Sequence, residues 1–157
     1  MAIVSAEQVA DWIVAMHHRH GDAITNLRLQ KLIYYVQAWY LVREKTALFE
    51  QDFEAWMHGP VIPELYHKYK KYGSNPIVWE GEIDESEGVP ELPDLDEGVA
   101  DHIIEVLNSY GNDSTWSLEQ RTHKERPWLA ARGGLPRDAV CTNVITKKSI
   151  EEYFSNL

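Results

Sequence analysis

An unusually apolar stretch in the first third of the chain constrains the fold most. The eleven residues Leu32–Val42 (LIYYVQAWYLV) contain one fully polar side chain, Gln37, and lie within a helix-compatible run from Leu27 to Lys45. On a helical projection the apolar side chains fall on both faces instead of one stripe. One face carries Leu29, Leu32, Ile33, Val36, Trp39 and Tyr40, and the other carries Leu27, Tyr34, Tyr35, Ala38, Leu41 and Val42. A second layer, either more of the same domain or a partner, must therefore cover this helix.

Length and cysteine content limit the class of protein. A chain of 157 residues can bury a sizeable core, and we expect a single domain over residues 1–157. The single cysteine, Cys141, excludes an intrachain disulfide and a multi-cysteine zinc site, and we expect it to be buried. The first residues lack the features of a secretory signal, and no apolar run approaches the roughly 20 residues that cross a bilayer. These features predict a cytoplasmic protein without a membrane anchor.

Acidic charge is concentrated in one segment. The net charge is −10, and residues 80–97 hold nine acidic residues and no basic one. Self-repulsion and low hydrophobicity favour an exposed acidic loop within the domain. Solubility is its simplest role, and docking on a basic partner or mimicry of a nucleic acid is the alternative. The only local basic cluster, His67, Lys68, Lys70 and Lys71, is too small to favour direct nucleic-acid binding.

Local patterns predict a mainly α fold. Ser5 and Gln8 form a capping-box start for a first helix up to Gly21, and Thr25 or Asn26 caps the apolar helix. Further helical patterns cover residues 63–72, 99–110, 116–123 and the segment after Thr146, with another turn at Pro127. Residues 53–57 alternate as a short strand, and residues 77–79 are expected to pair with it. We predict a compact helical domain of about six helices with a small two- or three-stranded β-sheet.

Candidate catalytic groups give little support for an enzyme. His17 and His20 have a spacing that suits a shared metal, but a solvated helix end is the simpler interpretation. His58 and His67 have no neighbouring nucleophile. His123 and Glu125 lie two apart, so in a helix they point in different directions. The chain contains no phosphate loop, dinucleotide fingerprint or zinc-protease motif. We predict no catalytic residue, no metal and no cofactor.

Aromatic residues are abundant, with six Trp and eight Tyr. Tyr and Trp dominate the energetics of protein interfaces, but they are also ordinary core residues. Core packing is the simpler interpretation for Trp39, Trp56, Tyr66 and Trp128. For Tyr34 and Tyr35 both alternatives stay open.

Three motifs together resemble the ordered signature of the Panacea domain, a family also described through SocA-like and phage-associated proteins. They are Q-K-L-x-Y-Y at residues 30–35, A-W-x-x-G-P-V-x-P-x-L-Y at residues 55–66 and T-H-x-E-x-P-W at residues 122–128. The resemblance covers nearly the whole chain, from Val9 to Phe154. It implies an antitoxin that neutralises a protein toxin, usually encoded by an adjacent gene, through direct stoichiometric binding.

The resemblance also implies an alternative, because SocA-like members act as adaptors that deliver a toxin to a Clp-type protease. Two further alternatives are an enzyme with an unrecognised site and a transcriptional autorepressor, which the lack of a basic surface disfavours.

Seven residues of the signature region are candidates for partner binding. Lys31 is the least expected, because a cation in an apolar helix needs a carboxylate, carbonyls or a partner. We expect these residues either to fasten the apolar helix to the neighbouring strand or to border the toxin-binding surface. The candidates are Gln30, Lys31, Tyr34, Tyr35, Trp56, His58 and Tyr66.

Overall fold

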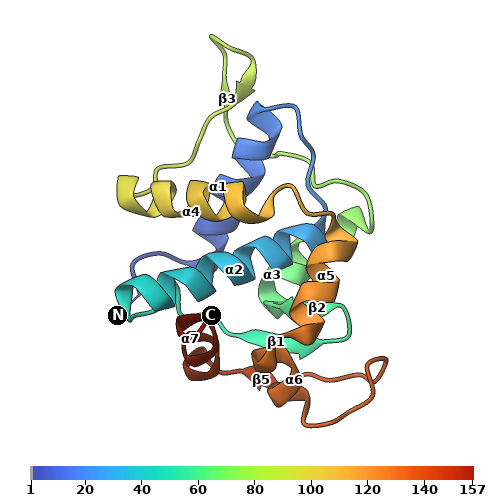
Figure 1. Cartoon of the computed structure of the whole chain (residues 1–157). Coiled ribbons are helices and arrows are strands. Elements are labelled where there is room, and N and C mark those ends of the chain that lie inside the picture. The colour runs from blue at the N-terminus through green and yellow to red at the C-terminus, as the bar shows by residue number, and fades with distance from the viewer. Residues whose placement is uncertain (1) are drawn as a thin grey trace.

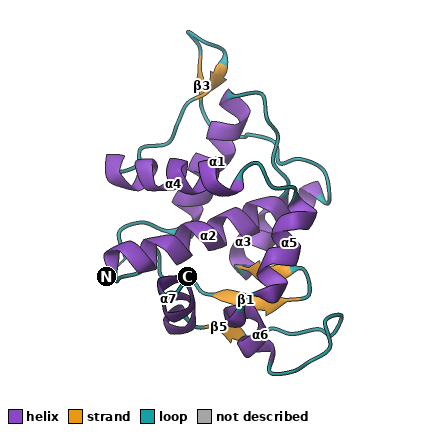
Figure 2. Ribbon diagram, viewed as in Figure 1, coloured by secondary structure: helices purple, strands orange, loops and turns teal. Residues whose placement is uncertain are grey.

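Seven α-helices and five short strands make up residues 2–157, the part of the chain that the computed structural model describes (Figures 1 and 2). The helices are α1 (Ala6–Arg19), α2 (Asn26–Glu44), α3 (Pro63–Tyr69), α4 (Glu97–Tyr110), α5 (Thr115–Lys124), α6 (Arg126–Arg132) and α7 (Lys147–Ser155), and a 3-10 turn (Lys70–Tyr72) follows α3. The strands are β1 (Phe53–Trp56), β2 (Gly59–Val61), β3 (Ile83–Asp84), β4 (Val89–Pro90) and β5 (Val144–Ile145). The mainly α prediction is confirmed, and the seventh helix is α6, which was expected only as a turn.

Helix α2 lies at the centre of the molecule, and its apolar faces are covered by the domain itself. Helices α1, α3, α4, α5 and α7 and strand β2 all contact it (Figure 1). Tyr34 and Tyr35, on the face expected to be polar, are fully buried. The second layer that the sequence required is therefore more of this chain. None of the helices in residues 2–157 has the length and apolar character that crossing a membrane requires.

Local capping places the starts of α1, α2 and α7 as predicted. The Ser5 side chain accepts from the Gln8 backbone, and the Gln8 side chain accepts from the Ser5 backbone, so the capping box is complete. Thr25 caps α2, and Thr146 caps α7. These bonds satisfy amides that the first turn of a helix leaves unpaired.

The small sheet has the order β2-β1-β5, with both pairs antiparallel. The prediction of β1 is confirmed, but the expected pairing with residues 77–79 is wrong. The chain turns back directly after β1, because Gly59 adopts a φ of +114° that side chains disfavour. Pro60 has no N–H to donate, but it lies on an edge strand, where this is tolerated. The Ile77 amide instead donates to Ile24 O at 2.8 Å.

The acidic segment, expected as an exposed loop, contains an antiparallel hairpin of β3 and β4. The Asp84 carboxylate closes its turn by accepting from Ser86 N at 3.0 Å and from Ser86 Oγ. Arg19 of α1 donates to Pro90 O at 2.9 Å and pairs with Glu87 at 3.3 Å. The hairpin projects from the helical body at the end of the molecule far from α6 (Figure 1).

Candidate partner-binding site

The tight turn between β1 and β2 brings the three signature motifs together. Only Met57 and His58 separate the paired residues Trp56 and Gly59. A Cβ placed on Gly59 would lie 3.0 Å from Thr122 Oγ1 on α5. The turn is therefore pressed against α5 so closely that glycine is needed there for space as well as for its backbone angle.

Side chains from α5 and α6 fasten this turn through its carbonyl groups. Trp128 Nε1 donates to Trp56 O at 2.8 Å, and His123 Nε2 donates to Met57 O at 2.8 Å. His58 Nδ1 lies 3.2 Å from Glu119 Oε1. His123 thus has a structural contact in the turn, and burial lowers its pKa.

Lys31 lies beneath the turn, with only 1% of its surface exposed. Its Nζ donates to Leu27 O at the long distance of 3.4 Å. Burial lowers the pKa of Lys31 to about 8, and the nearby Glu119 carboxylate partly opposes this shift. The surroundings of the ammonium group thus compensate its buried positive charge only weakly.

Gln30 fastens α2 to the start of α3. Its Nε2 donates to Asn26 Oδ1 at 3.1 Å, and its Oε1 accepts from Ile62 N at 3.0 Å. Asn26 in turn donates to Tyr66 O at 3.1 Å. This buried network positions the segment that carries Tyr66.

Tyr34 and Tyr35 belong to a buried aromatic cluster. The Tyr35 hydroxyl lies 3.1 and 3.2 Å from the two oxygens of Glu125, and its ring stacks on Tyr110 at 4.0 Å. Burial raises the pKa of Glu125 to about 7, although the Tyr35 hydrogen bond and Arg121 lower it. The Tyr34 hydroxyl has no hydrogen-bond partner among residues 2–157.

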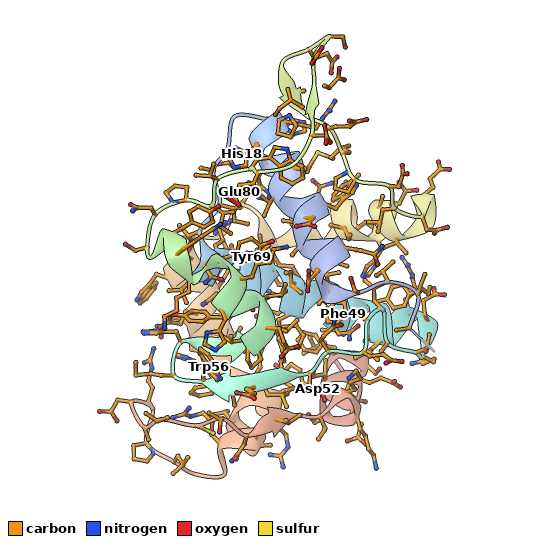
Figure 3. All side chains as sticks on the ribbon, turned by 180° about the vertical axis from the view of Figure 1, so that it is seen from behind. His18, Phe49, Asp52, Trp56, Tyr69 and Glu80 are labelled. Carbon is orange, nitrogen blue, oxygen red and sulfur yellow. The ribbon has the colours of Figure 1, made fainter. Side chains whose placement is uncertain are left out.

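An apolar pocket of about 290 Å³ opens beside the β1–β2 turn. The rings of Trp56 and Tyr66 meet edge to face in it, with their centroids 5.0 Å apart. The wall opposite comes from the loop after α6, where Val140 is 90% exposed. Figure 3 places Trp56 at the end of the molecule away from His18 and Glu80. The lining residues are Leu27, Trp56, Met57, His58, Val61, Tyr66, Val140, Cys141 and Thr142.

The structure divides the seven predicted residues into two groups. Trp56, His58 and Tyr66 line the pocket and are at least partly exposed. The other four lie underneath and are almost fully buried: Gln30, Lys31, Tyr34 and Tyr35. The wall formed by Val140–Thr142 was missed, because nothing in that stretch of sequence indicates which part of the chain it meets.

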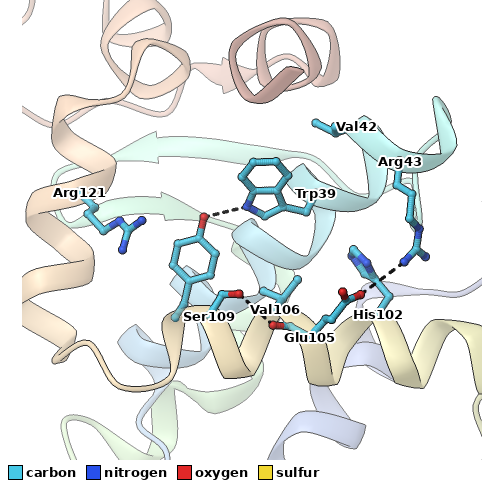
Figure 4. A pocket seen from close by; sticks show the side chains of 9 residues that line it. Trp39, Val42, Arg43, His102, Glu105, Val106, Ser109 and Arg121 are labelled. Carbon is cyan, nitrogen blue, oxygen red and sulfur yellow. Dashed lines mark hydrogen bonds and ion pairs between the residues drawn. The ribbon is translucent and has the colours of Figure 1, made fainter. Parts of the chain in front are cut away.

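A second cavity, of about 410 Å³, lies between α2, α4 and α5 (Figure 4). Trp39 Nε1 donates to the Tyr110 hydroxyl at 2.8 Å, and Arg121 lies over the Tyr110 ring at 4.7 Å. Arg121 also pairs with Asp113 at 2.7 Å. The polar side chains of this cavity thus have partners within the chain, among them Val36 O for His102.

The histidines at the end of α1 bond to the backbone. His17 and His20 each donate through Nδ1 to a carbonyl one turn earlier, at 2.8 and 2.9 Å. His18 Nε2 donates to Ile77 O at 2.8 Å. Within residues 2–157, no group of three or more His, Cys, Asp or Glu side chains is placed to hold a metal ion.

Comparisons with known proteins agree on one family. The family model described as antitoxin SocA-like, Panacea domain, matches residues 29–129. Antitoxin SocA of Caulobacter vibrioides (strain NA1000 / CB15N) is 30% identical over 135 residues, which is 83% of this chain and 72% of that protein. No solved structure matches the chain.

Proposed function

Since the chain belongs to the SocA-like, Panacea-domain antitoxin family, we propose that it neutralises a cognate protein toxin by direct, stoichiometric binding. The toxin is the product of an adjacent gene, and the antitoxin acts without catalysis by covering a functional surface of the toxin. An interface of roughly 1,600 Å² in total with a few aromatic anchors is sufficient for tight inhibition.

The pocket beside the β1–β2 turn is the observation that carries this proposal. Trp56 and Tyr66 present partly exposed aromatic rings, and aromatic side chains in pockets are typical hot spots of interfaces. Exposed Met57 and Val140 extend the apolar surface around them. Such a surface suits a protein partner better than it suits a small polar substrate.

The four buried candidates support this surface from below in the proposed mechanism. Gln30 bonds to the backbone that precedes Tyr66, and Lys31 lies beneath Gly59. Tyr35 bonds to Glu125, the N-cap residue that precedes α6. They act on toxin binding by positioning the turn, and they contact the toxin only through residues above them.

Co-expression with the product of the adjacent gene tests the proposal. The expected result is rescue of growth together with a one-to-one complex that survives purification. Rescue with loss of the toxin but no complex would favour the protease adaptor, and neutralisation at substoichiometric amounts would favour catalysis. Absence of rescue and of a complex would contradict the proposal.

A matched pair of variants locates the interface. Tyr66→Ala removes a pocket residue, and Tyr72→Ala removes a partly buried tyrosine that lies outside the pocket. Loss of a hot-spot tyrosine weakens binding by about tenfold or more. We therefore expect this loss for Tyr66→Ala only, with circular dichroism confirming that both variants fold.

A further inference from the structure

One long stretch of this acidic chain has more basic than acidic residues. Residues 115–148 contain seven Lys or Arg and three acidic residues, whereas the rest of the chain has eight basic and 22 acidic residues. Between Arg126 and Lys148 the single acidic residue is Asp138. Figure 1 places α6 and the following loop at the end of the molecule opposite the acidic β3–β4 hairpin.

Three of these cations are exposed and form no ion pair within residues 2–157: Lys124, Arg126 and Arg137. By contrast, Arg121 pairs with Asp113 and Lys147 with Asp52. Arg132 is buried and donates to backbone carbonyls. The unpaired cations therefore have their charge available to a partner.

Apolar side chains are exposed among these cations. Those from the β1–β2 turn, α6 and the segment after α6 are Met57, Leu129, Leu135, Val140 and Val144. Val140 lines the pocket and follows Arg137 by three residues. Arg137 is also close enough to His123 to help lower its pKa, and His123 bonds to Met57. Arg137 thus lies near the surface that contains the pocket. Lys124 and Arg126 lie at the junction of α5 and α6, between His123 and Trp128, which bond to the β1–β2 turn.

We propose that this basic face, defined as Lys124, Arg126 and Arg137 with Met57, Val140 and the adjoining pocket, binds an acidic surface of the toxin that carries an apolar anchor. The anchor side chain fills the pocket between Tyr66 and Val140, and the carboxylates around it pair with the three free cations. The inference rests on the proposed function, since it names the chemistry of the toxin that the same surface recognises.

Charge complementarity carries this inference. The chain carries a net charge of −10, so unpaired exposed cations such as those of the basic face are where it can attract carboxylates. The apolar side chains among the cations favour a protein as the partner. A nucleic acid would require many phosphate contacts, and the basic face offers only three unpaired cations. Binding to the toxin should therefore weaken as the salt concentration rises.

Two charge-matched double variants test the inference. Lys124→Glu with Arg137→Glu reverses two cations of the basic face. Lys45→Glu with Lys70→Glu reverses two exposed cations that lie outside it and that also form no ion pair within residues 2–157. Both double variants change the net charge by the same amount. The probe is the purified product of the adjacent gene, with affinity measured at low and high salt.

The basic-face variant should lose about tenfold or more in affinity at low salt, lose growth rescue and show a smaller salt dependence. The control variant should stay within about twofold of the unmodified chain. For the anchor, Val140→Asp should weaken binding, whereas Val78→Asp, which is also exposed, should not. Circular dichroism of all four variants separates lost binding from lost folding.

Equal effects of the two double variants, with rescue by the unmodified chain intact, would overturn the inference and leave the proposed function standing. Absence of rescue by the unmodified chain would overturn both. Binding of duplex DNA or single-stranded RNA at about 0.15 M salt, lost only in the basic-face variant, would assign the face to nucleic acid instead. Salt-sensitive self-association through the acidic hairpin would assign it to a second copy.

Discussion

Glu125 is a buried acid whose ionisation opposes folding. It is only 8% exposed, and burial raises its pKa from 4.5 to about 7. The pKa of Glu125 is higher in the folded than in the unfolded chain, so the fold favours the protonated carboxyl group. The stability that comes from this preference is fully present below pH 4.5 and is lost as the pH rises through about 7. Glu125→Gln keeps the acceptor for Tyr35 and removes the charge. At pH 8 it should raise the free energy of unfolding by about 2–3 kcal/mol, and at pH 4.5 it should change little.

Urea unfolding at the two pH values measures this difference. The control is Glu85→Gln, an exposed residue of the hairpin turn, which should change stability by less than about 0.5 kcal/mol at both. A less stable Glu125→Gln protein at pH 8 would mean that the ionised carboxylate is compensated in the fold.

Lys31 is a buried base for which the sign of the pH dependence is reversed. Its pKa falls from 10.5 to about 8, so the fold favours the neutral amine. The stability that comes from this preference is fully present above pH 10.5 and is lost as the pH falls through about 8. Lys31→Met keeps the aliphatic stem and removes the charge. We expect the variant to be more stable by about 2–3 kcal/mol at pH 7, with the gain shrinking towards pH 10.

Thermal or urea unfolding across this pH range tests the expectation. If Lys31→Met is instead less stable at pH 7, the Leu27 carbonyl and Glu119 compensate the charge more than its burial costs. If the variant is stable but no longer neutralises the toxin, Lys31 also contributes to the binding surface through the turn above it.

At the scale of elements, the β1–β2 turn depends on Gly59. A side chain at φ +114° is strained, and the added Cβ would press on Thr122. Gly59→Ala should therefore cost about 2–3 kcal/mol in the free energy of unfolding. Gly21→Ala, also at positive φ but with open space around it, should cost about 1 kcal/mol.

A double-mutant cycle separates the two causes. In a Thr122→Ala background the steric part of the Gly59→Ala cost should disappear, and the backbone part should remain. Equal costs for Gly59→Ala and Gly21→Ala would show that the turn is not pressed against α5.

The elements that sequence reasoning located correctly are those with local causes. The capping box at Ser5 and the cap at Thr146 act within four residues, so their patterns are sufficient to place α1 and α7. The partner of β1 was missed, because the pairing depends on the backbone angle of Gly59 and on its contact with α5. Strand pairing is a tertiary property. Residues 77–79 have a composition typical of a strand, but the fold does not bring them next to β1.

The candidate site was predictable to a similar extent. Its aromatic residues stand out in the sequence, and Trp56 and Tyr66 do line the pocket. The opposite wall could not be predicted, because Arg132 shapes it. Arg132 is buried and donates to Ala55 O on β1 and to Pro136 O and Ala139 O in the loop, which brings Val140 to the pocket.

At the scale of the whole molecule, α2 makes the fold cooperative. It is apolar on both faces and cannot persist in water without the helices that surround it. The β3–β4 hairpin is the opposite case, since it has two paired positions and projects from the body (Figure 1). Stability should therefore be distributed very unevenly between these two elements.

Hydrogen exchange followed by mass spectrometry tests this unevenness. Amides in the middle of α2 should exchange only through global unfolding and be protected by a factor on the order of 10⁴ or more. Amides of the hairpin should open locally and be protected by less than about 10², because few buried contacts hold them. The Lys31→Met variant should raise protection in α2 and leave the hairpin unchanged, since only global unfolding exposes α2. Equal protection of the two elements would mean that the hairpin unfolds together with the core. Repulsion among its acidic side chains would then lower the free energy of global unfolding.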